Sequence, residues 1–340
     1  MKTAPPGLAL LVPMALLVGC RTESDRSIAG TLVANHTSNF SAWSEPVSLG
    51  PAINTPGFND QQAVLSKDGL SLYFASNRPG ALGTQGLLDI WVSQRACADA
   101  SCPWGTPVSL GPTVNSSASD FAPALSRDEH WLFFGSGRQA GAAGSGDIWV
   151  SFRANVHDDF GWQAPVNLGA GVNTSGFEGG PAYFENDDVG ASQLLFNRNS
   201  LPVNTGGDIY VSEQAPDGSW GTAVPVPELN TDSTDQHPSV APNGVEIYFH
   251  SNRLGSTLDP LGTTTSNDIW VSTRESVLAP WSTPTNLGAP INTAADESGA
   301  VIFSHRQTEE LFFTRNVATP PAVDRDLFVS TRAREGQGPE

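Results

Sequence analysis

Asp89-Ile90-Trp91-Val92-Ser93 (DIWVS) is the stretch that decides the fold, because close copies of it return at nearly constant spacing. The copies are DIWVS at 147–151, DIYVS at 208–212, DIWVS at 268–272 and DLFVS at 326–330, at steps of 58, 61, 60 and 58 residues. Alternation of aliphatic, aromatic and small polar residues is typical of a strand. Self-similarity at a fixed period indicates a repeat architecture.

Three further markers accompany this strand in a fixed order. A Trp shortly before Pro occurs at Trp43, Trp104, Trp162, Trp220 and Trp281. An Asn followed by Thr or Ser occurs at Asn54, Asn115, Asn173, Asn230 and Asn292. A short apolar run occurs at 72–74, 132–134, 194–196, 247–249 and 311–313. Each unit therefore holds four short strand candidates, which in the first unit are 63–66, 70–75, 90–93 and 104–110.

Four strands per unit, five units and no helical periodicity predict an all-β fold, a five-bladed β-propeller with four strands per blade. The 34 Gly and 26 Pro argue against a helical solenoid. The chain begins with a surplus outer strand at 43–50 and ends with a third strand at 326–331 that lacks an outer neighbour. We therefore expect the N-terminal strand to complete the last blade within a propeller spanning 41–332, followed by a disordered tail at 333–340.

The N-terminus resembles a bacterial lipoprotein signal over residues 1–20. Lys2 supplies the positive charge, 7–19 form a 13-residue apolar segment too short to span a bilayer, and Leu17-Val18-Gly19-Cys20 resembles a lipobox. An ordinary cleaved signal peptide with an incidental Cys is the alternative. We expect lipidation at Cys20, a flexible tether over 21–40, and a location in the bacterial cell envelope, anchored to the outer membrane on its periplasmic or surface face.

Charge and cysteine use restrict the partners. With 17 Lys+Arg against 35 Asp+Glu, the net charge of −18 disfavours nucleic acid, and membrane contact is expected through the lipid anchor only. We expect a monomer. Cys97 and Cys102 are five residues apart, which in an oxidising compartment favours a disulfide within one loop.

One acid stands before each predicted innermost strand, and these acids are the candidate ligand-binding ring at the channel mouth. They are Asp60, Asp120, Glu178, Asp235 and Glu297. A structural interpretation makes each a hydrogen-bonding clamp for its loop; a functional one makes an acidic ring for a cation or a sugar. His237 joins the ring as a candidate, although a structural role is favoured because it has no nucleophile partner. We expect no cofactor and assign no catalytic residue. A cation bound at the acidic channel mouth is an alternative.

A second recurring pair joins an Arg after the second strand to the Asp that opens the third. The pairs are Arg78 with Asp89, Arg138 with Asp147, and Arg253 with Asp268, each expected to close the base of a long loop. In the third and fifth units Arg198 and Arg315 come two residues earlier, so different clamps are expected there. These long, Gly-rich loops share a face with the acids, and that face is the predicted binding surface.

The unit W-x-x-P-V-x-L-G, I-N-T, D-x-x-P-A-L-S-x-D-G-x-x-L-Y-F-x-S-N-R and D-I-W-V-S resembles the TolB-type, WD-like propeller repeat. It is most similar to the version found beside peptidoglycan-binding modules in bacterial envelope proteins, and the resemblance covers about 41–332. The resemblance implies a propeller fold and says little about function.

The leading functional hypothesis is a binding or scaffold module that presents its loop-rich face to an envelope protein or glycan, without enzymatic activity. The alternative is a glycoside hydrolase of the five-bladed propeller type that uses the channel-mouth carboxylates. A third hypothesis is a purely structural spacer. Nearly equivalent acids in every unit favour the first over the second.

Overall fold

The computed structural model describes residues 40–82, 86–99, 101–186, 190–199, 206–259, 261–262, 265–305, 307–318 and 323–335. The expected signal peptide, Cys20, nearly all of the tether and the end of the tail lie outside the described residues. Among the described residues, no helix is long and apolar enough to cross a membrane.

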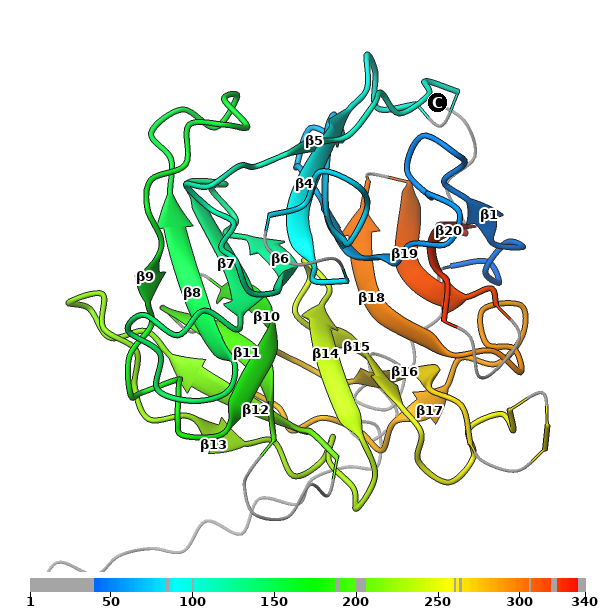
Figure 1. Cartoon of the computed structure of the whole chain (residues 1–340). Coiled ribbons are helices and arrows are strands. Elements are labelled where there is room, and N and C mark those ends of the chain that lie inside the picture. The colour runs from blue at the N-terminus through cyan, green and yellow to red at the C-terminus, as the bar shows by residue number, and fades with distance from the viewer. Residues whose placement is uncertain are drawn as a thin grey trace, which may run out of the picture. The chain divides into compact units, whose positions relative to one another are not determined.

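Five antiparallel sheets of four strands each form the blades, as Figure 1 shows. Blade 1 contains β2 (Asp60–Leu65), β3 (Ser71–Ser76), β4 (Asp89–Gln94) and β5 (Val108–Ser109), and blade 2 contains β6 (Asp120–Leu125), β7 (Trp131–Ser136), β8 (Asp147–Phe152) and β9 (Val166–Asn167). Blade 3 contains β10 (Phe177–Asn186), β11 (Ala191–Asn199), β12 (Asp208–Glu213) and β13 (Val224–Pro225). Blade 4 contains β14 (Asp235–Val240), β15 (Glu246–Ser251), β16 (Asp268–Thr273) and β17 (Thr285–Asn286). Blade 5 contains β18 (Glu297–Ser304), β19 (Thr308–Asn316), β20 (Arg325–Ala333) and β1 (Val47–Ser48). The predicted all-β, five-bladed propeller is confirmed.

The innermost and outermost strands differ in extent from the sequence prediction. In blade 1 the innermost strand begins at Asp60 rather than at Ala63, because the ladder with β3 extends to Asp60 opposite Ser76. The outer strand β5 has only two residues, Val108 and Ser109, in the ladder. Pro107 precedes them and has no N–H to donate, which explains why regular pairing does not extend further back.

The recurring Asn residues tie each blade to the one before it. In the first linker the Asn54 side chain accepts the Leu327 N–H at 2.8 Å and donates to the Leu327 carbonyl at 3.0 Å. The same two bonds join Asn115 to Ile90, Asn173 to Ile148, Asn230 to Ile209 and Asn292 to Ile269. An amide side chain carries both a donor and an acceptor, so it forms the two hydrogen bonds that a backbone residue of a neighbouring strand would form.

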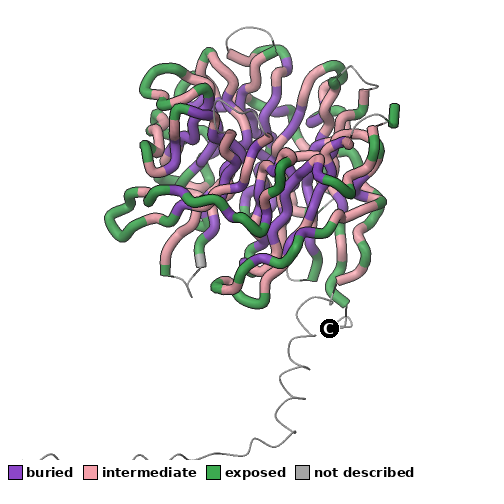
Figure 2. The backbone as a smooth tube through the Cα atoms, turned by 90° about the horizontal axis from the view of Figure 1, so that it is seen from below, coloured by how far each residue is buried: buried purple, intermediate pink, exposed green. Residues whose placement is uncertain are grey.

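Apolar side chains from adjacent sheets pack between the blades. Figure 2 shows buried segments toward the centre of the propeller and exposed ones in the outer loops. Between blades 1 and 2, for example, Tyr73 and Ile90 pack with Leu132, Phe134 and Trp149. Four of the five outer-strand Trp side chains also pack against an Arg from the end of the third strand. The four pairs, with guanidinium-to-ring distances, are Arg95–Trp104 (4.5 Å), Arg153–Trp162 (4.5 Å), Arg274–Trp281 (4.1 Å) and Arg332–Trp43 (4.6 Å).

The ring closes through the N-terminal strand. β1 pairs antiparallel with β20, with Val47 opposite Val329 and Ser48 opposite Phe328 (Figure 1). Further backbone bonds run from Ser41 to Ala333 and from Ser44 to Thr331. The predicted closure of the last blade by the N-terminal strand is therefore confirmed, and it covers an edge of β20 that would otherwise be open.

Removing residues 41–50 should therefore destabilise the propeller, because it exposes the edge of β20 and removes the Trp43 side chain from beneath Arg332. We expect the unfolding midpoint to fall by roughly 5 °C or more. Tryptophan fluorescence during heating measures it, with a deletion of residues 21–38 as the control. Equal midpoints for the two deletions would contradict the proposed importance of closure.

Candidate functional site

The five acids that begin the innermost strands are buried, and each is paired with an Arg of its own blade. Asp60, Asp120, Glu178, Asp235 and Glu297 are all 0% exposed. Their partners are Arg78, Arg138, Arg198, Arg253 and Arg315, respectively. The expected pairing of these arginines with the Asp of the third strand is wrong: Arg78, Arg138 and Arg253 bind the acid of the first strand instead.

Each pair also holds the linker that enters its blade. In blade 1, Arg78 donates to the Ile53 carbonyl, and Asp60 accepts the Thr55 N–H at 2.6 Å. The other four blades repeat both bonds at 114 and 116, 172 and 174, 229 and 231, and 291 and 293. An Arg can bind a carboxylate and a carbonyl at once because its donors point in several directions in one plane. The acid and the Arg thus clamp the backbone on either side of the linker Asn.

The clamp has two chemical versions that reach the same result. In blade 1 a Ser, Ser76, lies opposite Asp60, and the Arg two residues later reaches back to both. In blades 3 and 5 the Arg lies directly opposite a Glu, as Arg315 does opposite Glu297. The Glu side chain is one methylene longer than that of Asp, and this length lets it pair with an Arg that stands two residues earlier on the second strand. Blades 3 and 5 are therefore clamped with a different pair of residues, as expected, but the clamp binds the same acid position and the same linker as in the other blades.

These contacts occupy the carboxylates of the predicted ring. Asp120 receives the Ser116 N–H, the Ser116 hydroxyl and Arg138. Burial nevertheless raises the pKa of Glu297 to about 7, against the hydrogen bonds from Thr293 and the charge of Arg315. The geometry matches the hydrogen-bonding clamp described above. It does not bring the five side chains together as an exposed ring.

His237 lies deeper in the channel than the acids, at a bulge that every innermost strand shares. The bulge residues Gln62, Ala122, Gly180, His237 and Gly299 all have left-handed backbone angles, with φ between 51° and 57°. The ladder shifts register at this point in each blade, for example between Gln236 and Ser239. These five residues surround a space of only about 30 Å³, so the channel is constricted here.

Gln62 and His237 face each other across this constriction. Their Nε2 atoms are 3.0 Å apart, and because the amide nitrogen can only donate, the imidazole Nε2 is the acceptor. The His237 ring also stacks on His250 at 5.2 Å. Burial and then the charge of Arg325 lower the pKa of His237 to about 4. His237 is therefore neutral near pH 7. Among the described residues, no group of three or more His, Cys, Asp or Glu could hold a metal ion.

Beyond the constriction, at the C-terminal ends of the innermost strands, the channel widens into a cavity of about 640 Å³. Much of its wall is apolar and comes from equivalent positions in the five blades, for example Val64, Ala124 and Val240. Two carboxylates line it, Glu129 and Glu185, together with the cations Lys67 and Arg127. The predicted binding surface was the opposite face, where the acids and long loops lie. The larger of the two cavities described above is instead at this end.

Glu129 occupies a backbone conformation that the turn normally gives to glycine. Its φ is 61°, whereas the equivalent residues of blades 1 and 4 are Gly69, with φ 73°, and Gly244, with φ 72°. A left-handed conformation costs a non-glycine residue roughly 1–2 kcal/mol. The Glu129 carboxylate accepts the N–H of Lys67 from the adjacent blade at 2.6 Å. Such strain persists only where surrounding contacts hold the residue in place, and strained residues cluster at functional sites.

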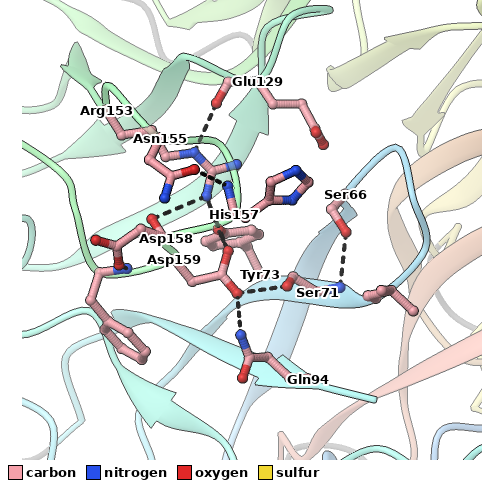
Figure 3. Close-up of polar contacts among 12 residues, drawn as sticks. Ser66, Ser71, Tyr73, Gln94, Glu129, Arg153, Asn155, His157, Asp158 and Asp159 are labelled. Carbon is pink, nitrogen blue, oxygen red and sulfur yellow. Dashed lines mark hydrogen bonds and ion pairs between the residues drawn. The ribbon is translucent and has the colours of Figure 1, made fainter. Parts of the chain in front are cut away.

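A buried polar network fixes the turn that carries Glu129 (Figure 3). The Arg153 Nε donates to the Glu129 carbonyl at 2.9 Å, and its Nη1 lies 3.0 Å from Asp159. Asp159 in turn accepts hydrogen bonds from Tyr73 and Gln94 of blade 1. Arg153 is fully buried, so this network holds its position between blades 1 and 2.

Sequence reasoning missed Glu129, although a signal was present. The turn reads Ser-Lys-Asp-Gly at 66–69 and Ser-Arg-Asp-Glu at 126–129, so the second copy breaks the repeat at a position that needs glycine. Glu185 carries no comparable signal. Cys97 and Cys102 form a disulfide on a loop outside this cavity.

Asp89, which opens the third strand of blade 1, is also buried, but its hydrogen bonds are incomplete. One carboxylate oxygen accepts the Leu82 N–H at 2.6 Å, and among the described residues the other has no partner. Burial raises the pKa of Asp89 to about 6. The folded protein therefore keeps a proton on Asp89 at pH values where the unfolded chain has lost it.

The free energy of unfolding should consequently fall as the pH rises from about 4 to about 6, with Asp89 contributing roughly 1–2 kcal/mol of the decline. The Asp89→Asn variant cannot titrate, so its stability curve should be flatter over this range. Urea unfolding at a series of pH values checks this. Parallel curves for the two proteins would rule out the buried proton.

The two clamp versions predict a compensated substitution in blade 5. Glu297→Asp should cost about 1–3 kcal/mol, because the shorter side chain no longer reaches Arg315 and Thr293 while both remain buried. Adding Arg315→Ser and Val317→Arg rebuilds the arrangement of blade 1 and should recover most of the loss. Thermal unfolding of the single and triple variants measures both effects. A triple variant less stable than the single one would contradict the equivalence of the two clamps.

No family model matches the chain, and no curated protein matches its sequence. Its fold is similar to several solved structures. The catalytic domain of the Coprinopsis cinerea GH62 alpha-L-arabinofuranosidase has a TM-score of 0.55 at 12% identity, covering 88% of this chain and 99% of that one. The endo-arabinase from Bacteroides thetaiotaomicron has a TM-score of 0.55 at 16% identity, with the same coverage, and the Bacillus subtilis arabinanase has 0.53 at 17% identity, covering 83% and 96%.

At these identities the likeness shows the fold alone. The expected membership of the TolB-type, WD-like repeat family is nevertheless wrong. The solved structures to which the fold is similar include five-bladed glycoside hydrolases and not TolB-type proteins. The chain shares its five-bladed architecture with these solved enzymes.

Proposed function

We propose that this chain is a glycoside hydrolase whose active site is the cavity at the C-terminal ends of the innermost strands, with Glu129 and Glu185 as its two carboxyl groups. The observation that carries the proposal is Glu129. It holds a carboxylate at the cavity wall in a backbone conformation that the equivalent turns of blades 1 and 4 give to glycine. A volume of about 640 Å³ lies within the range of small-molecule sites.

The interpretation of the chain as a binding or scaffold module without enzymatic activity is contradicted by the structural neighbours. The similar structures include an arabinofuranosidase, two arabinanases and a beta-xylosidase, all of which are enzymes acting on sugars. Their likeness supports the hydrolase alternative. The five clamp acids, however, are poor candidates for its catalytic groups, because each is buried and paired with an Arg.

Hydrolysis of a glycosidic bond consumes one water and needs two carboxyl groups. One donates a proton to the leaving oxygen, and the other takes a proton from the attacking water or attacks the anomeric carbon itself. Glu129 suits the second role, because the Lys67 N–H and the Arg153 network fix its orientation. Glu185 lines the same cavity from the next blade, and we assign it proton donation to the leaving oxygen.

Tyr183 places an aromatic side chain on the same wall. Tyr183 lines the cavity and is stacked on Phe133 at 5.3 Å, with the two ring planes only 15° apart. Its hydroxyl donates to Ser192 at 2.7 Å, so the ring is fixed at both its face and its tip. A fixed aromatic side chain on a wall that also carries two carboxylates supports a carbohydrate ligand.

The test is hydrolysis of a panel of chromogenic arabinofuranosides and xylosides, and of fructans, by the full chain. Glu129→Gln and Glu185→Gln should each lower kcat by about 10²-fold or more. The matched control is Glu228→Gln, an exposed glutamate that does not line the cavity. No turnover by the unmodified chain, or equal activity of Glu129→Gln and the control, would overturn the proposal.

A stability measurement separates a catalytic from a structural role for Glu129. Glu129→Gly removes the backbone strain as well as the carboxylate, so its unfolding midpoint should stay within a few degrees of the parent while activity is lost. A large loss of stability would instead assign Glu129 to the contact with Lys67.

A further inference from the structure

Lys67 is unusual in this sequence and lies at the cavity. The chain has only two lysines, Lys2 and Lys67, so Lys67 is the single lysine after the predicted signal peptide. It lies in the β2–β3 turn, its side chain is exposed, and it lines the cavity described above. The inference drawn from it rests on the proposed hydrolase function.

Most other described cations are committed to contacts within the fold. Five arginines form the clamps, Arg153 pairs with Asp159, and Arg332 pairs with Glu246 and Glu309. Arg95 and Arg274 lie over Trp rings. In the described part of the chain, Lys67 has no carboxylate within ion-pair distance. It therefore presents a positive charge to the cavity of a protein whose net charge is −18.

The backbone holds Lys67 next to the proposed catalytic carboxylate. The Lys67 backbone N–H donates to the Glu129 carboxylate at 2.6 Å. The side-chain amine therefore belongs to the same residue that Glu129 contacts through the backbone. The β2–β3 turn thus places the lysine charge on the wall that holds Glu129. In a partly enclosed site such a charge acts more strongly on an anion than it would on open surface.

We propose that the cavity takes a glycan that carries a carboxylate, a uronic-acid sugar, and that Lys67 binds this carboxylate. A neutral sugar would leave the lysine charge without a partner. A uronate supplies a planar anion that an ammonium can approach directly, in an otherwise acidic protein that repels anions elsewhere.

The experiment measures binding by calorimetry to the full chain carrying Glu129→Gln, so that no turnover occurs. The probes are trigalacturonate and the neutral galactotriose of equal length. We expect trigalacturonate to bind at least tenfold more tightly, and more weakly as salt is raised. In this background Lys67→Gln should remove the preference and Lys67→Arg should retain most of it. Arg334→Gln, which removes an equal charge away from the cavity, should have no effect.

Three results overturn the inference. Equal binding of both saccharides, or a preference that survives Lys67→Gln, rejects the role of Lys67 and leaves the hydrolase proposal intact. Binding of neither saccharide also rejects it, and the hydrolysis panel with Glu129→Gln then decides separately whether the chain is an enzyme.

Discussion

The buried carboxylate–arginine pair at the start of each innermost strand is the interaction on which the rest of the propeller depends. Removing such a pair from water is costly unless every donor and acceptor finds a partner. Here the remaining atoms bind the linker backbone, as Asp60 binds Thr55 and Arg78 binds Ile53. The linker Asn54 then binds the preceding blade. Three polar side chains therefore set the position of each blade relative to the last, and apolar packing fills the space between them.

This use of the repeated acids determines where chemistry can occur. A carboxylate that completes a clamp in every blade has no free orientation, so function has to come from residues that depart from the repeat. Glu129 replaces a turn glycine, and Lys67 is the only lysine after the predicted signal peptide. Gln62 and His237 close the channel at a bulge where the other blades have Ala or Gly. These departures all lie along the channel, at or beyond its constriction. The clamps lie at its other end.

The sequence predicted the fold well because the fold depends on repeated, local patterns. Strand markers spaced by about 60 residues defined the blades, and the surplus strand at 43–50 defined the closure. The partner of Arg78 could not be predicted, because Asp60 and Asp89 are both within reach along the chain. The choice depends on the Ile53 carbonyl, which only the folded linker brings near. The cavity was missed because its wall consists of ordinary apolar strand residues such as Val64 and Val240. Glu129 could have been found by comparing the turns of the five units.

Closure through β1 also means that both ends of the propeller leave it at one blade, where Phe40 pairs with Arg334. Joining these ends directly and opening the chain at another linker would preserve every sheet, since each of the five junctions is held by the same Asn, acid and Arg. The final arrangement of the blades therefore does not depend on which blade the chain begins with. In topological terms the propeller is a circle with an arbitrary cut, and circular permutation is built into its architecture.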